Sequence, residues 1–345
     1  MAPNRPTRPA GRSVNTDDLP PKPYELVSFP KKRPVLAKPV GHHRYAKTGY
    51  HGTLSLSLRV KTALHVSTGI TAMGSDVASR VPLIKTMTQG RNQQLVIQGS
   101  SLKGCVRAIY EAITNSTLAV VSNRYRQQMP SDRLPCRQKD SLCPASQVFG
   151  ALDWQGLVHF TDARCVQADS VTGFMPSLYR PRPDQREAYF ERGKAAGRKF
   201  YRHAREAIDG GNRGIPVQQA GTEYTFKTEL QFLNLSQAQL GTLLISLGQD
   251  ANYPMALKLG GGKPVGLGTV QIAIEEAEVT QDVRDRYAHY AVPEAAKLAG
   301  EPLATFVQEK IQVAHREKLV EQDQLAQLSQ VLQWPTNREA PTGMY

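Results

Sequence analysis

The chain has 345 residues, 40% of them apolar, which is enough for the core of one elaborated or two ordinary domains. No apolar run approaches the roughly 20 residues that span a bilayer, the first twenty residues form no apolar signal segment, and four cysteines are too few for a secreted disulfide scaffold, so we expect a cytoplasmic protein without a membrane partner. The formal net charge of +13 favours a polyanionic partner, and RNA or DNA is the commonest one in the cytosol.

The N-terminal part of the chain carries the basic excess. Residues 1–23 contain six prolines and few large apolar groups, which predicts a disordered basic, proline-rich arm. Residues 26–110 hold thirteen lysines and arginines against a single carboxylate, Asp76. Within residues 24–50, cations such as Arg44 are interleaved with aromatic side chains, a combination that suits contacts to an RNA backbone and stacking on bases. A solvated basic face kept for solubility, with the aromatics packed on the core, is the alternative.

From residue 53 onward the hydrophobic periodicity predicts regular elements. Residues 53–60 alternate as a half-buried strand does, and apolar residues recur at helical spacing over about 101–119, with Ser100 or Ser101 as the cap. Strands are predicted over 157–166, 222–233 and about 267–274, with a helix opened by the capping box of Ser236 and Gln239 before the last of them. The order β, α, β, β, α, β predicts an α+β domain with a modified ferredoxin-like or RNA-recognition fold.

Other stretches fall outside this core. Residues 120–156 and 167–221 would be large insertions within a domain that covers 24–279. The Ala-, Gln-, Leu- and Glu-rich sequence near the end of the chain predicts a helical extension over 280–345. Because residues 271–345 carry twelve acids against seven bases, this end is expected to pack on the domain or meet a basic partner rather than bind nucleic acid.

A glycine-rich segment, LKLGGGKPVGLGTVQI at 257–272, is the strongest local motif. Gly260, Gly261 and Gly262 remove side chains next to Lys263, so that backbone N–H groups could approach phosphates. A P-loop needs Ser or Thr where Pro264 stands, and a dinucleotide-binding loop needs a strand before it and a helix after it. The segment is therefore interpreted as a clamp on a nucleic-acid backbone, with a plain glycine turn before the last strand as the alternative.

A second motif, LVIQGSSLKGCVRAIYEAI at 95–113, predicts a strand, a tight turn and a helix. The free amides of the helix N-terminus, the hydroxyls of Ser100 and Ser101 and the cations Lys103 and Arg107 together suit a phosphodiester.

The two motifs, with ALHVSTG at 63–69 before them and CPASQVFG at 143–150 between them, resemble the RAMP superfamily of CRISPR-associated proteins and, within it, the backbone subunits of type III effector complexes. The sequence segments 23–52 and 197–203 are similar to those of the III-D branch and its single-chain fusion relatives. The resemblance covers residues 24–279. It implies a guide-RNA-binding subunit of a multisubunit complex, in which the serine-lysine turn and the glycine-rich loop line the RNA groove.

The resemblance also implies a cleavage residue, because in many such subunits an acid in a loop before the serine-lysine turn cuts target RNA with a divalent metal. Asp76 is the only carboxylate of the matching loop, 69–86. It could hold Mg²⁺ or orient a ribose 2′-hydroxyl for attack on the neighbouring phosphate, and His65 and Lys85 are either helpers or RNA contacts. The family usually places the acid beside a Pro-hydrophobic pair, whereas Asp76 lies six positions before Pro82, so an ordinary surface carboxylate is the alternative.

Cys136 and Cys143 raise the question of zinc. In similar subunits a second cysteine often stands where CPAS has Ser146, and a structural zinc site usually takes four Cys or His ligands. The remaining ligands would have to come from Cys165, His159 or His203. Two ordinary thiols beside a loop are the alternative.

The sequence therefore favours a guide-RNA-binding backbone subunit of a type III CRISPR ribonucleoprotein, with other effector subunits and target RNA as partners and metal-dependent cleavage through Asp76. The alternatives are a scaffold subunit without catalysis, a standalone guide-processing endoribonuclease with His65 as general base, and an unrelated basic RNA-binding module.

Overall fold

The fold is built around strand β2 (Tyr50–Val60), whose alternating residues Leu54, Leu56 and Leu58 are at most 1% exposed. The computed structural model describes residues 23–178, 190–281, 287–288, 290 and 297–341. Strand β2 runs antiparallel to β15 (Thr225–Leu235) on one side and to β17 (Thr269–Thr280) on the other. The alternation that predicted a strand with one buried face is thus present at the centre of the sheet.

The main sheet has eight strands, ordered β16-β17-β2-β15-β9-β5, with β18 paired to β17 and β8 paired to β15. Its short strands are β5 (Val96–Ile97), β8 (Val158–Phe160), β9 (Ala163–Cys165), β16 (Leu257–Lys258) and β18 (Lys297–Leu298). With helices α1 (Gly99–Ile113) and α3 (Gln237–Ser246), the chain order is β2, α1, β8 and β9, β15, α3, β17. The predicted α+β class is confirmed.

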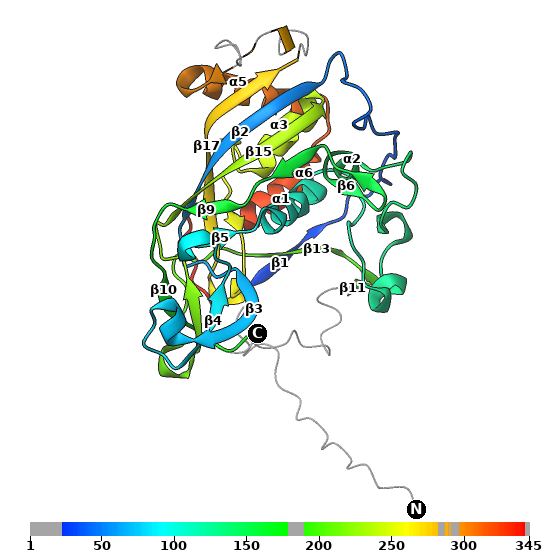
Figure 1. Ribbon diagram of the computed structural model, residues 1–345. Helices are drawn as coiled ribbons and strands as arrows, with labels where there is room; N and C mark the ends of the chain where they lie inside the picture. Colours follow the sequence, from blue (N-terminus) through cyan, green and yellow to red (C-terminus); the bar gives the residue numbers. More distant parts are fainter. Residues whose placement is uncertain (1–22, 179–189, 282–286, 289, 291–296, 342–345) are drawn as a thin grey trace, which may run out of the picture.

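The helices lie together on one side of the central strands, where they cover the buried leucines (Figure 1). Helix α5 (Gly300–Arg316) packs on α3 so closely that a Cβ on Gly241 would lie 1.9 Å from the carbonyl oxygen of Lys310. Helix α6 (Gln322–Val331) packs on α1. Helix α3 begins with the predicted capping box, because the Ser236 hydroxyl accepts from the Gln239 amide at 3.2 Å and the Gln239 side chain accepts from the Ser236 amide at 3.0 Å.

Helix α1 begins earlier than the sequence predicted. Its first residue is Gly99, and the residue before it makes no side-chain cap, so the expectation of a serine cap at Ser100 or Ser101 is wrong. The carboxylate of Asp162, between β8 and β9, accepts the Gly99 amide hydrogen at 2.8 Å. A cap supplied from another part of the chain replaces the local one.

A second sheet, which the sequence did not predict, has the order β10-β14-β4-β3. Its strands are β3 (Ser67–Met73), β4 (Leu83–Met87), β10 (Val171–Met175) and β14 (Ile215–Gln219). Two of them come from the insertion at 167–221, and the other two form the hairpin that carries the Asp76 loop. Most residues of β3 are exposed, so no alternation of apolar side chains marks this strand in the sequence.

A two-stranded ribbon of β1 (Tyr24–Ser28) and β13 (Gly197–Tyr201) brings the basic phrase of the second insertion next to α1 and α6 (Figure 1). The remaining regular elements are short: α2 (Pro144–Phe149) and the strands β6 (Gly150–Ala151), β7 (Trp154–Gln155), β11 (Phe190–Glu191) and β12 (Lys194–Ala195). The predicted arm at 1–23 lies outside the described residues except for its last position. Across the described chain, no helix combines the length and the apolar character needed to cross a membrane.

Candidate nucleic-acid interface

The glycine-rich loop is held against the segment that follows β2. The Gly261 amide donates to the His65 carbonyl oxygen at 2.8 Å, and the Gly268 amide donates to the Ala63 carbonyl oxygen at 2.9 Å. Gly260 and Gly262 have φ values of +72° and +67°, which a residue with a side chain adopts only with strain. The loop therefore has one defined shape, and Lys263 lies half-exposed on it.

The first turn of α1 faces this loop across a cavity of about 390 Å³. Ser101 and Gly104 line it from α1, and Gly260 and Lys263 line it from the loop. The two motifs, which lie far apart in the sequence, thus meet in space on one hollow. Ser100 is exposed beside it at the start of the helix, and Gly262 is buried behind the loop surface.

Among the other residues that line the cavity are two lysines and a tyrosine that the sequence did not single out: Lys199, Tyr201 and Lys258. The Lys199 ammonium lies over the ring of Tyr201, 4.8 Å from its centroid, and over that of Tyr24, 4.6 Å from its centroid. Lys199 and Tyr201 belong to the basic segment GRKFYRH of the second insertion, for which the sequence predicted no place at the RNA groove. Their position beside α1 follows from the pairing of β13 with β1, which no local pattern shows.

Two of the predicted RNA contacts are engaged within the chain. Lys103 Nζ donates to the Val158 carbonyl oxygen at 2.8 Å, and burial lowers the pKa of this lysine. Arg107 donates through Nε to Glu111 at 2.7 Å and through Nη2 to the Ser146 hydroxyl at 3.4 Å. Both cations therefore contribute first to holding α1 in place.

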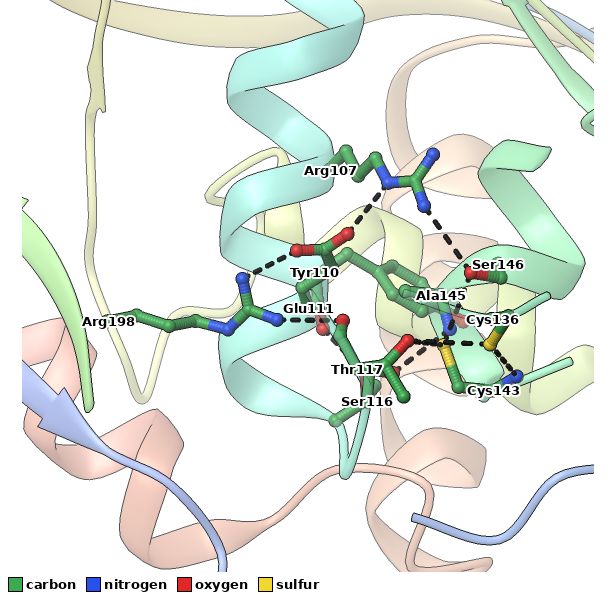
Figure 2. A network of polar contacts seen from close by, with 11 residues as sticks. Arg107, Tyr110, Glu111, Ser116, Thr117, Cys136, Cys143, Ala145, Ser146 and Arg198 are labelled. Carbon is green, nitrogen blue, oxygen red and sulfur yellow. Dashed lines mark hydrogen bonds and ion pairs between the residues drawn. The ribbon is translucent and has the colours of Figure 1, made fainter. Parts of the chain in front are cut away.

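Figure 2 shows the polar network that surrounds Arg107. The buried carboxylate of Glu111 also accepts from Arg198 of β13 at 2.5 Å, and Arg198 donates to the Thr117 carbonyl oxygen at 2.9 Å. The network ties α1, the segment after it and β13 together. It fixes the strand that carries Lys199 relative to the helix that carries Ser101.

His65 is only 2% exposed, so its ring does not reach the cavity surface as a free base. Its Nδ1–H donates to the Gln218 carbonyl oxygen at 2.7 Å, and burial lowers its pKa. Its backbone carbonyl holds the glycine-rich loop. The structure therefore gives His65 a part in positioning that loop.

Asp76 is exposed in the short 3₁₀ helix Gly74–Val77, at the tip of the β3–β4 hairpin. The tip is tied to the second sheet by a 2.7 Å hydrogen bond between Ser79 and Thr172. Among the described residues no hydrogen bond or ion pair engages the Asp76 carboxylate. A single free carboxylate suits Mg²⁺, which is commonly held by one or two carboxylates together with substrate phosphates and water.

Arg44 lies at the other end of the central sheet. Its carbonyl oxygen accepts from Asn234, near the end of β15 and next to the start of β2. The glycine-rich loop adjoins the opposite end of β2, where the Lys61 amide donates to Thr269. A strand of this length spans about 35 Å, so the structure does not bring Arg44 to the cavity.

Cys136 and Cys143 are neighbours. The Cys143 amide donates to Cys136 Sγ at 3.3 Å, and the Thr117 hydroxyl lies 3.4 and 3.2 Å from the two sulfurs. The hydrogen bond from the Cys136 thiol lowers the pKa of Cys143. Cys165 lies in β9, and within the described part of the chain no three Cys, His, Asp or Glu side chains are grouped as metal ligands. The thiol pair supplies half of a structural zinc set, so zinc binding stays a prediction.

The chain matches one family model and is similar to solved structures. A family model described as the RAMP superfamily matches residues 57–271, from β2 through the glycine-rich loop into β17. No curated protein matches the chain. Among solved structures, the crystal structure of Thermofilum pendens Csc2 is similar over 80% of each chain, at 15% sequence identity and a TM-score of 0.33.

Proposed function

Because the chain belongs to the RAMP superfamily, we propose that it is a guide-RNA-binding backbone subunit of a type III CRISPR ribonucleoprotein, most similar to the III-D branch. It works in the cytoplasm with other effector subunits and with target RNA as the second strand.

The observation that carries this proposal is the meeting of the α1 turn and the glycine-rich loop on one cavity. The polar groups that line it include the Ser101 hydroxyl and the ammonium groups of lysines such as Lys263. All of these recognise phosphate oxygens and none distinguishes one base from another, which suits a guide whose sequence varies. A plain glycine turn gives no reason for the first turn of α1 to face it across a cavity lined by lysines.

Lys263→Ala tests the RNA-binding function. It should weaken binding of every guide sequence alike and should lower the slope of log affinity against log salt by about 0.7, the value for one lost phosphate contact on a single strand. Fluorescence anisotropy with several unrelated guides measures both quantities. Lys297→Ala is the matched control, because Lys297 is an exposed lysine of β18, which pairs with the far end of β17.

Base-selective loss in Lys263→Ala would contradict backbone recognition. Isolation of the native complex and sequencing of the RNA that it carries tests the assignment as a whole. Recovery of the complex without guide RNA would refute it.

We extend the proposal to cleavage of the target strand at Asp76. The exposed, unengaged carboxylate lies at the tip of a braced hairpin, where it can hold Mg²⁺ or receive the proton of the attacking ribose 2′-hydroxyl. Asp76→Ala in the assembled complex should slow target cutting by at least about 100-fold while guide binding is unchanged. Asp140→Ala, which removes another exposed carboxylate, is the control.

Gel analysis of labelled target RNA with Mg²⁺ decides between the catalytic and the purely structural subunit. If every cut persists in Asp76→Ala, the subunit is a scaffold. A standalone processing ribonuclease is disfavoured because its candidate base, His65, is buried and already donates to a carbonyl oxygen.

A further inference from the structure

Lys258 is a buried cation at the base of the cavity. It is 5% exposed, and its ammonium donates to the Gly266 carbonyl oxygen at 3.1 Å and to the Thr269 hydroxyl at 3.3 Å. An ammonium has three donor hydrogens, so these two bonds leave one for a further acceptor. Lys258 also lines the same cavity as Ser101 and Lys263.

The neighbouring groups do not neutralise this charge. His203 Nε2–H donates to the Ala256 carbonyl oxygen at 2.9 Å, so its Nδ1 accepts from the Thr269 hydroxyl, also at 2.9 Å. Burial lowers the pKa of His203 to about 3, so its ring is neutral at physiological pH. Thr269 then offers its oxygen to Lys258, which leaves the positive charge in place.

No carboxylate forms an ion pair with Lys258 anywhere in the described chain. The titratable and charged groups that line the cavity with it are Lys263 of the loop, Lys199 and Tyr201 of β13, and Cys105 of α1, and His203 lies next to it through Thr269. Arg202, Arg338 and Glu339 lie with His203 and Lys263 around a second pocket beside Gly266. Buried charges are normally paired, because no interaction offsets the free energy that an unpaired charge loses when its hydration is removed. Lys258 is therefore a buried cation whose counter-charge an anion in the cavity would supply.

We propose that this cavity is a subsite for one phosphate group of the bound RNA strand, with Lys258 as its buried counter-charge. The inference rests on the proposed guide-binding function and adds a residue and a ligand group to it. The cavity volume of about 390 Å³ is more than ten times the roughly 30 Å³ share of one water, which leaves room for a ribose-phosphate unit. Lys199 of β13 and Lys263 of the loop also line the cavity, and the Ser101 hydroxyl can donate from the helix.

RNA binding at this subsite should be linked to proton uptake by Lys258. Burial, and then the charge of Lys263, lowers the pKa of Lys258 to about 7. A phosphate that enters the cavity favours the charged ammonium and raises this pKa, so above about pH 7 the protein must take up a proton as RNA binds. Affinity should therefore fall as pH rises through this range, by up to about tenfold per pH unit.

Lys258→Met tests the subsite, since it keeps the apolar stem and removes the ammonium. The probe is a short oligouridylate without terminal phosphates, bound to the full chain and followed by anisotropy between about pH 6 and 9, with calorimetry in two buffers of different ionisation enthalpy. The wild type should take up close to one proton per strand at alkaline pH. Lys258→Met should bind about 10- to 100-fold more weakly at neutral pH and should show no linked uptake at alkaline pH.

Lys297→Met is the matched control and should behave as the wild type. The thermal unfolding temperature of Lys258→Met should be at least as high as that of the wild type, because an unpaired buried charge has been removed. Millimolar inorganic phosphate should compete with the RNA in the wild type more than in the variant.

Two failures are distinguishable. If the wild type binds RNA and Lys258→Met binds it equally well with the same proton uptake, the subsite is wrong and guide binding stands. If the wild type binds no RNA, alone or in its complex, the proposed function itself fails. Equal competition by inorganic phosphate in both proteins would also overturn the subsite.

Discussion

Replacing Glu111 with glutamine is expected to lower the free energy of unfolding by about 3–5 kcal/mol. The Glu111 carboxylate is 4% exposed and is the acceptor for two guanidinium groups, Arg107 at 2.7 Å and Arg198 at 2.5 Å. The amide keeps the shape of the side chain but removes its charge. Two part-buried cations are then left side by side without a carboxylate between them.

Urea unfolding at neutral pH measures this effect. Glu309→Gln is the matched control, because Glu309 is an exposed carboxylate on α5 and its loss should change stability by no more than about 0.5 kcal/mol. In a double-mutant cycle with Arg107→Met, the second change should cost less in the Glu111→Gln background than in the wild type, since it removes one of the stranded charges. A Glu111→Gln protein as stable as the control would show that the network adds no net stability.

The consequence extends beyond stability, because Arg198 directly precedes Lys199 on β13. The ion pair with Glu111 anchors this strand to α1, and the cavity lies between the same two elements. Weakening of the anchor should therefore loosen one wall of the proposed phosphate site. Guide affinity of Glu111→Gln should fall even though Glu111 lies outside the cavity.

The elements that local pattern specifies were predicted well. The leucines of β2, the alternation of β15 and the capping box at Ser236 each depend on residues a few positions apart, so their signals are complete within one segment. The meeting of the α1 turn and the glycine-rich loop was a hypothesis from composition and resemblance. In the structure the two motifs line the same cavity, as that hypothesis requires.

The sequence could not separate cations that face a ligand from cations that hold the fold. Arg107 and Lys103 follow a helix start as phosphate-binding residues do, yet their acceptors are Glu111 and the Val158 carbonyl oxygen. Lys258 lies within the glycine-rich segment 257–272, but nothing in the sequence singled it out from its neighbours. Its importance comes from burial and from the absence of a paired carboxylate among the described residues, and both are properties of tertiary packing.

Replacing Gly260 with alanine is expected to weaken guide binding by at least about tenfold, which corresponds to about 1.4 kcal/mol. Gly260 has a φ of +72°, and an added Cβ would lie 2.4 Å from the His65 carbonyl oxygen. Left-handed backbone alone costs a residue with a side chain about 1–2 kcal/mol. The clash adds to this, because the opposing atom belongs to the backbone and cannot rotate away.

Gly300→Ala separates the clash from the strain, because Gly300 also has a positive φ, of +59°, but nothing lies within 4 Å of its missing Cβ. It should lose stability through backbone strain alone and keep its affinity for guide RNA. The same His65 carbonyl accepts the Gly261 amide, so displacement at Gly260 moves the loop away from α1 and separates Lys263 from Ser101. If Gly260→Ala bound RNA as tightly as Gly300→Ala, close packing of the loop on His65 would be unnecessary for recognition, and the two turns would not act as one site.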